Sequence, residues 1–406
     1  MPIEARCTLL LLLGLLAPLA AMQFDENGVS QRIRELIAEI SKRQEGDGHW
    51  DYSSYPVGCT ALCLLALKEA GVANNDPTVQ AATNFIFQTP SSRTYSEGLV
   101  PCAMELVDPV ATRDRLVQAL TYLVESQNSN GYWSYGPSRS GGDASNSQFA
   151  ILGLGAARRC GYVIPEETRL AALNYWYENQ NEDGGWGYSP KSGSQFQWTC
   201  AGIASLHLLG ERFLHRPECC GPLRVNQAMQ RGLDYLAERL SGGGAVSRPY
   251  HLYAMERVGM FLGLERIGGV DWYQAGANAF MRLGLRGSTP DLAFQLLFLA
   301  KGNKPIAIAK WHWDPGLPAA YQADVDAWVE TAGKELGQRY DAISVRLGDR
   351  ASDDDLMRAS CLFLTGRGLF QLDAQAVTSL RAFLKAKGTL VIESRCDDPA
   401  FLRSVQ

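Results

Sequence analysis

One short motif recurs three times in the first half of the chain and constrains the fold more than any other feature. It consists of a glutamine, a polar turn that contains glycine, and a tryptophan six residues after the glutamine. The copies run from Gln44 to Trp50, from Gln127 to Trp133 and from Gln180 to Trp186. Because glycine readily adopts the positive backbone dihedrals that end a helix, each copy predicts a helix stop that the tryptophan then covers.

A small hydroxyl residue follows each motif after a loop and opens an apolar run. These residues are Thr60, Ser147 and Thr199. The segments before the motifs, such as residues 28–43, instead show charged and apolar residues at helical spacing. This contrast predicts helical hairpins. In each hairpin the first helix packs against the protein on one face, and the second helix is buried on both faces.

The chain from Gly28 to Gly302 divides into six such segments of two helices each, at 28–71, 77–111, 112–161, 165–215, 225–267 and 271–302. The second segment has Tyr95 roughly where the tryptophan is expected, and the last two keep the helices without the motif. Repeats of this length cannot bury their apolar faces alone. The sequence therefore predicts a mainly α protein in which six hairpins close into an α6/α6 toroid over residues 28–302.

With three copies in register, the sequence resembles the squalene cyclase and prenyltransferase repeat superfamily. In that superfamily, glutamine and tryptophan motifs lie between the outer and inner helices of a terpenoid cyclase-like α/α toroid. The resemblance implies a structural role for the motif residues, which are Gln44, Trp50, Gln127, Trp133, Gln180 and Trp186.

The motifs that carry chemistry in this superfamily are absent. The sequence contains no Asp-x-Asp-Asp of the cyclases, no Asp-x-Cys of the zinc-dependent prenyltransferases and no Cys-Gly-Glu-Gln of the thioester proteins. We therefore expect no metal and no cofactor, and a non-catalytic binding or assembly module. The alternative is a divergent terpenoid cyclase or prenyltransferase-like enzyme that acts on an isoprenoid in the toroid cavity.

Two acids are candidates for the catalytic role in that alternative. Asp143 precedes an inner apolar run, and Glu256 lies within another. An acid at a helix start also serves as an N-cap, which accepts hydrogen bonds from free backbone amides, and Asp143 or Asn146 suits that role.

The inner segment 249–259 places adjacent opposite charges, Glu256 and Arg257, where the ring should be lined. Buried charges need partners, so each is expected either to pair with a neighbouring helix or to serve a ligand. In the second case they would form a polar and aromatic pocket together with Asp143. The candidate pocket residues are Trp198, Tyr253 and Arg257.

From residue 305 to 406 short β-rich runs alternate with helical segments, which predicts a parallel α/β sheet. The order of strand, helix and strand over residues 361–392 resembles an uncharacterised domain related to the class I glutamine amidotransferase fold, in an incomplete form. The catalytic triad of those enzymes cannot be assembled here, because Cys361 opens its strand and no histidine follows His312.

Residues 1–22 resemble a signal peptide, which predicts a periplasmic or extracellular protein, with an uncleaved membrane anchor as the alternative. Beyond this segment nothing indicates membrane association. A net charge of -5 argues against nucleic acid as a partner, which leaves a protein or an apolar ligand. Cys59, Cys63 and Cys200 fall in apolar helices and are expected to be free thiols, whereas a disulfide from Cys219 or Cys220 is conceivable.

Overall fold

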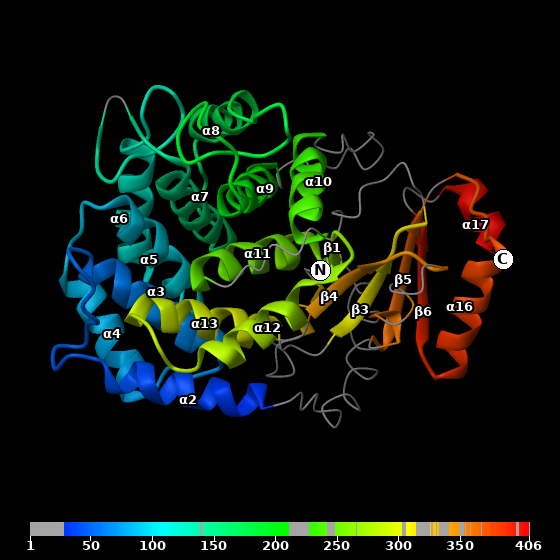
Figure 1. Ribbon diagram of the computed structural model, residues 1–406, viewed down its shortest axis with the longest axis horizontal. Coiled ribbons are helices and arrows are strands. Elements are labelled where there is room, and N and C mark those ends of the chain that lie inside the picture. The colour runs from blue at the N-terminus through cyan, green and yellow to red at the C-terminus, as the bar shows by residue number, and fades with distance from the viewer. Residues whose placement is uncertain are drawn as a thin grey trace.

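The computed structural model describes residues 28–138, 141–210, 227–241, 248–264, 266–302 and most of 306–405. The protein is mostly helical, and its four-stranded parallel sheet lies in the C-terminal part of the chain. The helices up to α13 occupy one end of the molecule, and the sheet with α16 and α17 occupies the other (Figure 1). The predicted signal peptide and Cys219 and Cys220 lie outside the described residues.

The first part of the chain alternates outer and inner helices. The outer helices are α2 (Val29–Lys42), α4 (Pro77–Gln88), α6 (Arg113–Glu125), α8 (Glu166–Glu178), α10 (Gln227–Ser241) and α12 (Trp272–Leu283). The inner helices are α3 (Pro56–Glu69), α5 (Thr94–Val107), α7 (Ala144–Arg159), α9 (Phe196–Gly210), α11 (Pro249–Leu262) and α13 (Thr289–Gly302). Each of the six predicted segments therefore contains one helix of each kind.

The inner helices form a closed ring. Each packs against the next in chain order, and α13 packs against α3 to complete the circle. The outer helices pack on this ring from outside: α4 on α3, α6 on α5 and α7, α8 and α10 on α9, α12 on α11 and α13, and α2 on α13. This is the arrangement of the α6/α6 toroid that the sequence predicts.

The glutamine of each motif ties one outer helix to the next. The side-chain amide of Gln127 donates to the carbonyl of Gly131 in its own turn, at 3.0 Å, and to that of Thr168 at the start of α8, at 2.9 Å. The other two copies repeat both bonds, from Gln44 to Gly48 and Thr78 and from Gln180 to Gly184 and Ala228. The motif thus joins successive hairpins.

The tryptophan of each motif joins the two helices within a hairpin. The indole N–H of Trp133 donates to the carbonyl of Leu123 in α6, and its backbone N–H donates to the hydroxyl of Ser147 in α7. Trp50 bonds in the same way to Ile40 and Thr60, and Trp186 to Trp176 and Thr199. The small hydroxyl residue at the start of each apolar run therefore accepts a hydrogen bond from the backbone N–H of the tryptophan.

The turn glycine is required by two constraints at once. Gly131 has a φ of 83°, and a Cβ there would lie 2.1 Å from the carbonyl oxygen of Ala171 in α8. Gly48 and Gly184 have the same positive φ and the same close approach to the next outer helix. Any side chain at these positions would be strained and would also push the hairpins apart.

One expectation about the second segment is wrong. Tyr95 does not replace the missing tryptophan in a turn, because it lies in the first turn of the inner helix α5. Its hydroxyl donates to Ser145 of α7. The α4–α5 hairpin is instead held by a buried ion pair, in which Arg115 of α6 bonds Glu97 of α5 and the carbonyl of Ile86 in α4.

The sheet has the parallel strands that the sequence predicts. They are β3 (Ile306–Trp311), β4 (Asp341–Val345), β5 (Cys361–Gly366) and β6 (Thr389–Ser394), in the order β4-β3-β5-β6. Helix α16 (Ala374–Lys385) connects β5 to β6, and α17 (Pro399–Val405) follows. A short hairpin, β1 (Arg266–Ile267) and β2 (Val270–Asp271), joins α11 to α12.

The sheet contacts the ring at the end of α11. The backbone N–H of Ser344 in β4 donates to the carbonyl of Gly263, which caps α11, at 2.9 Å. Arg266 of the β1–β2 hairpin lies 3.7 Å from the carboxylate of Asp355.

Two further observations concern cysteines and membranes. Cys59, Cys63 and Cys200 are free and buried, as expected. Of the helices that the structure describes, none combines the length and the apolar character needed to cross a membrane.

Candidate functional site

Aromatic side chains surround one end of the ring, where the inner helices begin. They form a continuous series of ring contacts over successive inner helices, with centroid distances between 4.8 and 6.0 Å: Tyr55 to Tyr95, Tyr95 to Tyr135, Tyr188 to Trp198, Trp198 to Tyr250, Tyr250 to Phe294 and Phe294 to Tyr253. The hydroxyls of Tyr135 and Tyr188, 3.0 Å apart, close the gap in this series. We call this set of residues the aromatic mouth.

Polar groups below the aromatic mouth are linked into one network. Ser145 at the start of α7 accepts a hydrogen bond from Tyr95 at 2.5 Å and lies 3.4 Å from the hydroxyl of Tyr250. Gln148, one turn later, donates to the same Tyr250 hydroxyl. These bonds connect α5, α7 and α11, and the last two helices are not neighbours in the ring, so the network crosses its centre.

Arg257 lies at the inner end of this network. Its side chain is 1% exposed, and its Nη2 donates to Oε1 of Gln148 at 2.5 Å. The guanidinium also lies over the ring of Tyr253, at 4.4 Å from the centroid. Among the described residues, Nε and Nη1 of Arg257 have no hydrogen-bond partner. A buried cation is therefore held by one neutral amide and aromatic faces.

Asp143 caps the start of α7. Its carboxylate accepts from the backbone N–H and the side-chain amide of Asn146, at 2.8 and 2.9 Å. Burial raises the pKa of Asp143, whereas the bonds from Asn146 and from Tyr188 lower it by less. The acid is thus an N-cap next to the aromatic mouth, which is the alternative role that its position in the sequence suggests.

Glu256 points in a different direction from Arg257. Neighbouring residues on a helix point about 100° apart, so the two charges face different directions. Glu256 is fully buried and approaches Lys301 of α13, at 3.9 Å, and Lys301 in turn lies 3.6 Å from Glu69 at the end of α3. Glu69 and Lys301 lie near the ends of α3 and α13, whereas Glu256 lies in the middle of α11, one turn after Tyr253.

The predicted pocket residues Trp198, Tyr253 and Arg257 are linked through this series of contacts, whereas Glu256 approaches Lys301. Reasoning from sequence missed Tyr188, Gln148 and the mouth-facing role of Tyr95. A signal for them was present, because each lies within about one turn of the start of an inner helix or in the loop that leads to it. All inner helices begin at the same end of the ring, so those positions converge.

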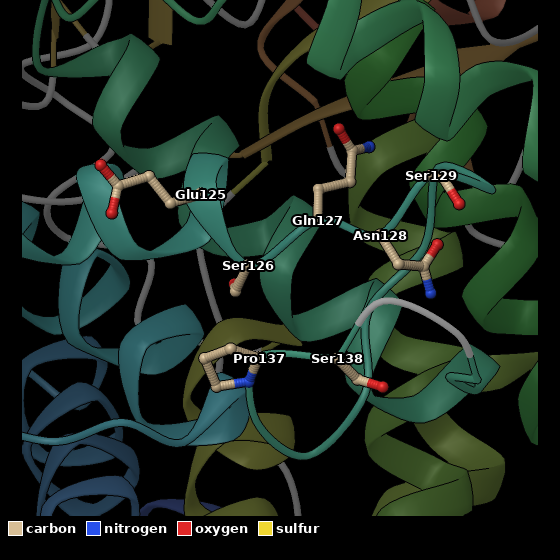
Figure 2. Close-up of a pocket in the computed structure, with 7 residues that line it drawn as sticks. All are labelled: Glu125, Ser126, Gln127, Asn128, Ser129, Pro137 and Ser138. Carbon is tan, nitrogen blue, oxygen red and sulfur yellow. The ribbon is translucent and has the colours of Figure 1, made fainter.

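A separate surface pocket of about 420 Å³ lies between the end of α6 and the loop at residues 137–138. It is lined by Glu125, Ser126, Gln127, Asn128, Ser129, Pro137 and Ser138 (Figure 2). The amides of Gln127 and Asn128 already donate to backbone carbonyls, at 3.0 and 2.7 Å for Gly131 and Gly141. This pocket is formed by the motif turn.

The other place where α/β proteins bind ligands is the carboxyl edge of the sheet, where strand order reverses. Here that point lies between β3 and β5, and aromatic residues occupy it. Trp313 follows β3 and contacts Phe370 and Phe401, with centroids 5.1 and 6.2 Å apart. Cys361 is buried at the opposite end of β5, so it is not presented there as a nucleophile.

A family model described as a domain of unknown function (DUF4159) matches residues 321–406. The match covers β4, β5 and β6 and the helices around them, and its description assigns no activity.

Proposed function

We propose that this chain is an exported member of the squalene cyclase and prenyltransferase repeat superfamily that binds a ligand at the aromatic mouth without transforming it. The observation that carries the proposal is the aromatic series over successive inner helices, which stands above a polar network. Binding sites for small molecules typically combine such aromatic walls with a few convergent polar groups.

The state of the two candidate acids supports the non-catalytic part of the proposal. Both oxygens of Asp143 accept hydrogen bonds from Asn146, and Glu256 is buried beside Lys301. An acid that starts an isoprenoid cyclisation has to present its proton to the substrate. The hydrogen bonds to Asp143 occupy its carboxylate, and Gln148 and Arg257 meet across the ring.

Native mass spectrometry of the purified protein tests this proposal. The protein is incubated with a crude extract of small molecules, and the adducts are compared with those of Trp198→Ala. The control is Tyr177→Ala, which alters a half-exposed tyrosine on the outer helix α8. We expect an unmodified adduct in the wild type and the control that is lost in Trp198→Ala. Equal adducts in all three proteins would contradict binding at the mouth.

A second candidate function is a divergent cyclase, and one observation favours it. Asp143 is buried beside the aromatic mouth, and burial raises its pKa. A carboxyl group that stays protonated is what acid-initiated cyclisation requires.

Incubation with squalene and with geranylgeranyl diphosphate, followed by mass spectrometry of the organic extract, distinguishes the two functions. A cyclised product that Asp143→Asn abolishes would support the cyclase. Recovery of both substrates unchanged, alongside a retained adduct, would support the binding module.

A further inference from the structure

The least expected feature of the ring is the environment of Arg257. Burial of a charged group is costly unless hydrogen bonds and an opposite charge compensate for it. For Arg257 the described residues supply one hydrogen bond, from Nη2 to Gln148, and two aromatic faces, those of Tyr253 and Phe149. Nε and Nη1 are buried donors without a partner among them.

Another buried arginine in the same protein shows what full compensation looks like. Arg115 donates from Nη1 and Nη2 to the two carboxylate oxygens of Glu97, at 2.7 Å each, and from Nε to the carbonyl of Ile86, at 3.1 Å. Both side chains of that pair are 3% exposed. The protein therefore pairs a buried guanidinium completely where the role is structural.

We propose that the ligand of the aromatic mouth is a monocarboxylate, and that Arg257 binds its carboxylate through the donors that the protein leaves unpaired. This inference rests on the proposed function and names the class of ligand.

The number of cations at the site favours a ligand with a single negative charge. Arg257 is the one cation in the network of Gln148, Tyr250 and Ser145 among the described residues. Lys301 of α13 approaches two carboxylates, Glu69 and Glu256, so its charge is balanced within the protein. A diphosphate would need several cations, whereas a carboxylate matches one planar guanidinium in charge and geometry.

The surroundings of Arg257 indicate what the rest of the ligand is. Outward from the guanidinium, Tyr253 contacts Phe294, and Phe294 contacts Tyr250, which in turn contacts Trp198. A planar apolar body attached to the carboxylate can stack on these rings. An arylacetic acid is a small compound with both parts.

Isothermal titration calorimetry with acetate and phenylacetate tests the proposal, and phenylacetamide serves as the neutral counterpart. We expect the wild type to bind both acids, phenylacetate more tightly, and phenylacetamide at least about 10-fold more weakly than phenylacetate. Arg257→Met should lower the affinity for both acids about 10- to 100-fold. Arg257→Lys, which keeps the charge, should restore part of it.

Two further variants distinguish failure of this inference from failure of the proposed function. Trp198→Ala should weaken phenylacetate and leave acetate unchanged, because only the aromatic body contacts the mouth. Arg159→Met serves as a control, since Arg159 of α7 pairs with Glu105 near the far end of the ring and should not affect either acid.

Two results would overturn the inference. One is binding of phenylacetamide as tight as that of phenylacetate, which would leave the aromatic mouth as a site for neutral ligands. The other is binding of both acids that Arg257→Met and Arg257→Lys leave unchanged. If acetate binds through Arg257 but Trp198→Ala changes nothing for phenylacetate, the anion site stands and the aromatic mouth fails as the ligand site.

Discussion

Two buried arginines of the ring differ in how the protein compensates their charge. Arg115 of α6 donates to both carboxylate oxygens of Glu97, at 2.7 Å each, and to the carbonyl of Ile86. Arg257 of α11 has, among the described residues, a neutral amide and aromatic faces in place of a carboxylate. A charge that meets its partner within the protein stabilises the fold, whereas one that does not is available to a ligand.

This difference can be tested most strongly by removing one arginine of each kind. Arg115→Met leaves Glu97 buried without its partner, so we expect it to lower the free energy of unfolding by about 3–5 kcal/mol. Arg257→Met removes a buried cation that no described carboxylate balances, so the relieved desolvation should offset the lost bond to Gln148 and leave stability within about 1 kcal/mol of the wild type. Urea unfolding followed by tryptophan fluorescence measures both. Equal losses would remove the distinction between the two sites.

The side-chain amide of each motif glutamine donates two hydrogen bonds within the protein. Its replacement should therefore affect stability and not ligand binding. Gln127→Ala leaves the carbonyls of Gly131 and Thr168 without their donor, so we expect a loss of about 1–3 kcal/mol. Gln31→Ala is the control, because Gln31 makes one exposed bond to Glu35 and should change stability by less than about 0.5 kcal/mol. Binding of phenylacetate should be the same in both variants, and a loss in Gln127→Ala would show that the motif contributes to the site.

Removal of the hydroxyl that accepts the hydrogen bond from the tryptophan backbone N–H should lower the stability by less. Ser147→Ala removes the acceptor for the N–H of Trp133 and the donor to the carbonyl of Asp143, at 3.0 and 2.7 Å. We expect a loss of about 1 kcal/mol in urea unfolding. Ser147→Thr keeps both bonds and is the type found at Thr60 and Thr199, so it should retain most of the stability.

The smallest expected effect is a pH dependence from Asp143. Its pKa is raised above the ordinary value of 3.8, chiefly by burial, so the folded state favours the protonated form. The stabilisation is present below pH 3.8 and is lost as the pH rises through the folded-state pKa. Asp143→Asn lacks this titration, so its stability relative to the wild type should increase as the pH rises above 3.8 through the folded-state pKa. A difference that does not change with pH would contradict the raised pKa, and one that decreases as the pH rises would show that the cap favours the carboxylate.

Much of the ring could be predicted because its information is local. The spacing of Gln127, Gly131 and Trp133 specifies a helix end, and three copies specify a repeating hairpin. The partners were not predictable from that spacing. Thr168 and Ala171 lie on the next outer helix, and only the closed ring brings their carbonyls to the turn.

The site was predictable only in part for the same reason. Arg257, Tyr253 and Trp198 were identified from unusual residues in an apolar helix. Gln148 was not, because it lies on α7 and meets Arg257 of α11 across the ring, a contact with no periodic signal. The orientation of Glu256 away from Arg257 follows from helix geometry once the direction of the ring centre is known.

The most direct test of the account is a crystal structure of the protein grown with 4-bromophenylacetate, with bromine located by its anomalous scattering. We predict one ordered bromine among Tyr250, Phe294 and Trp198, with the carboxylate bonded to Nε or Nη1 of Arg257. Bromine ordered elsewhere, for instance in the surface pocket beside Glu125, or a mouth without bound ligand at a concentration that saturates the protein in solution, would contradict it.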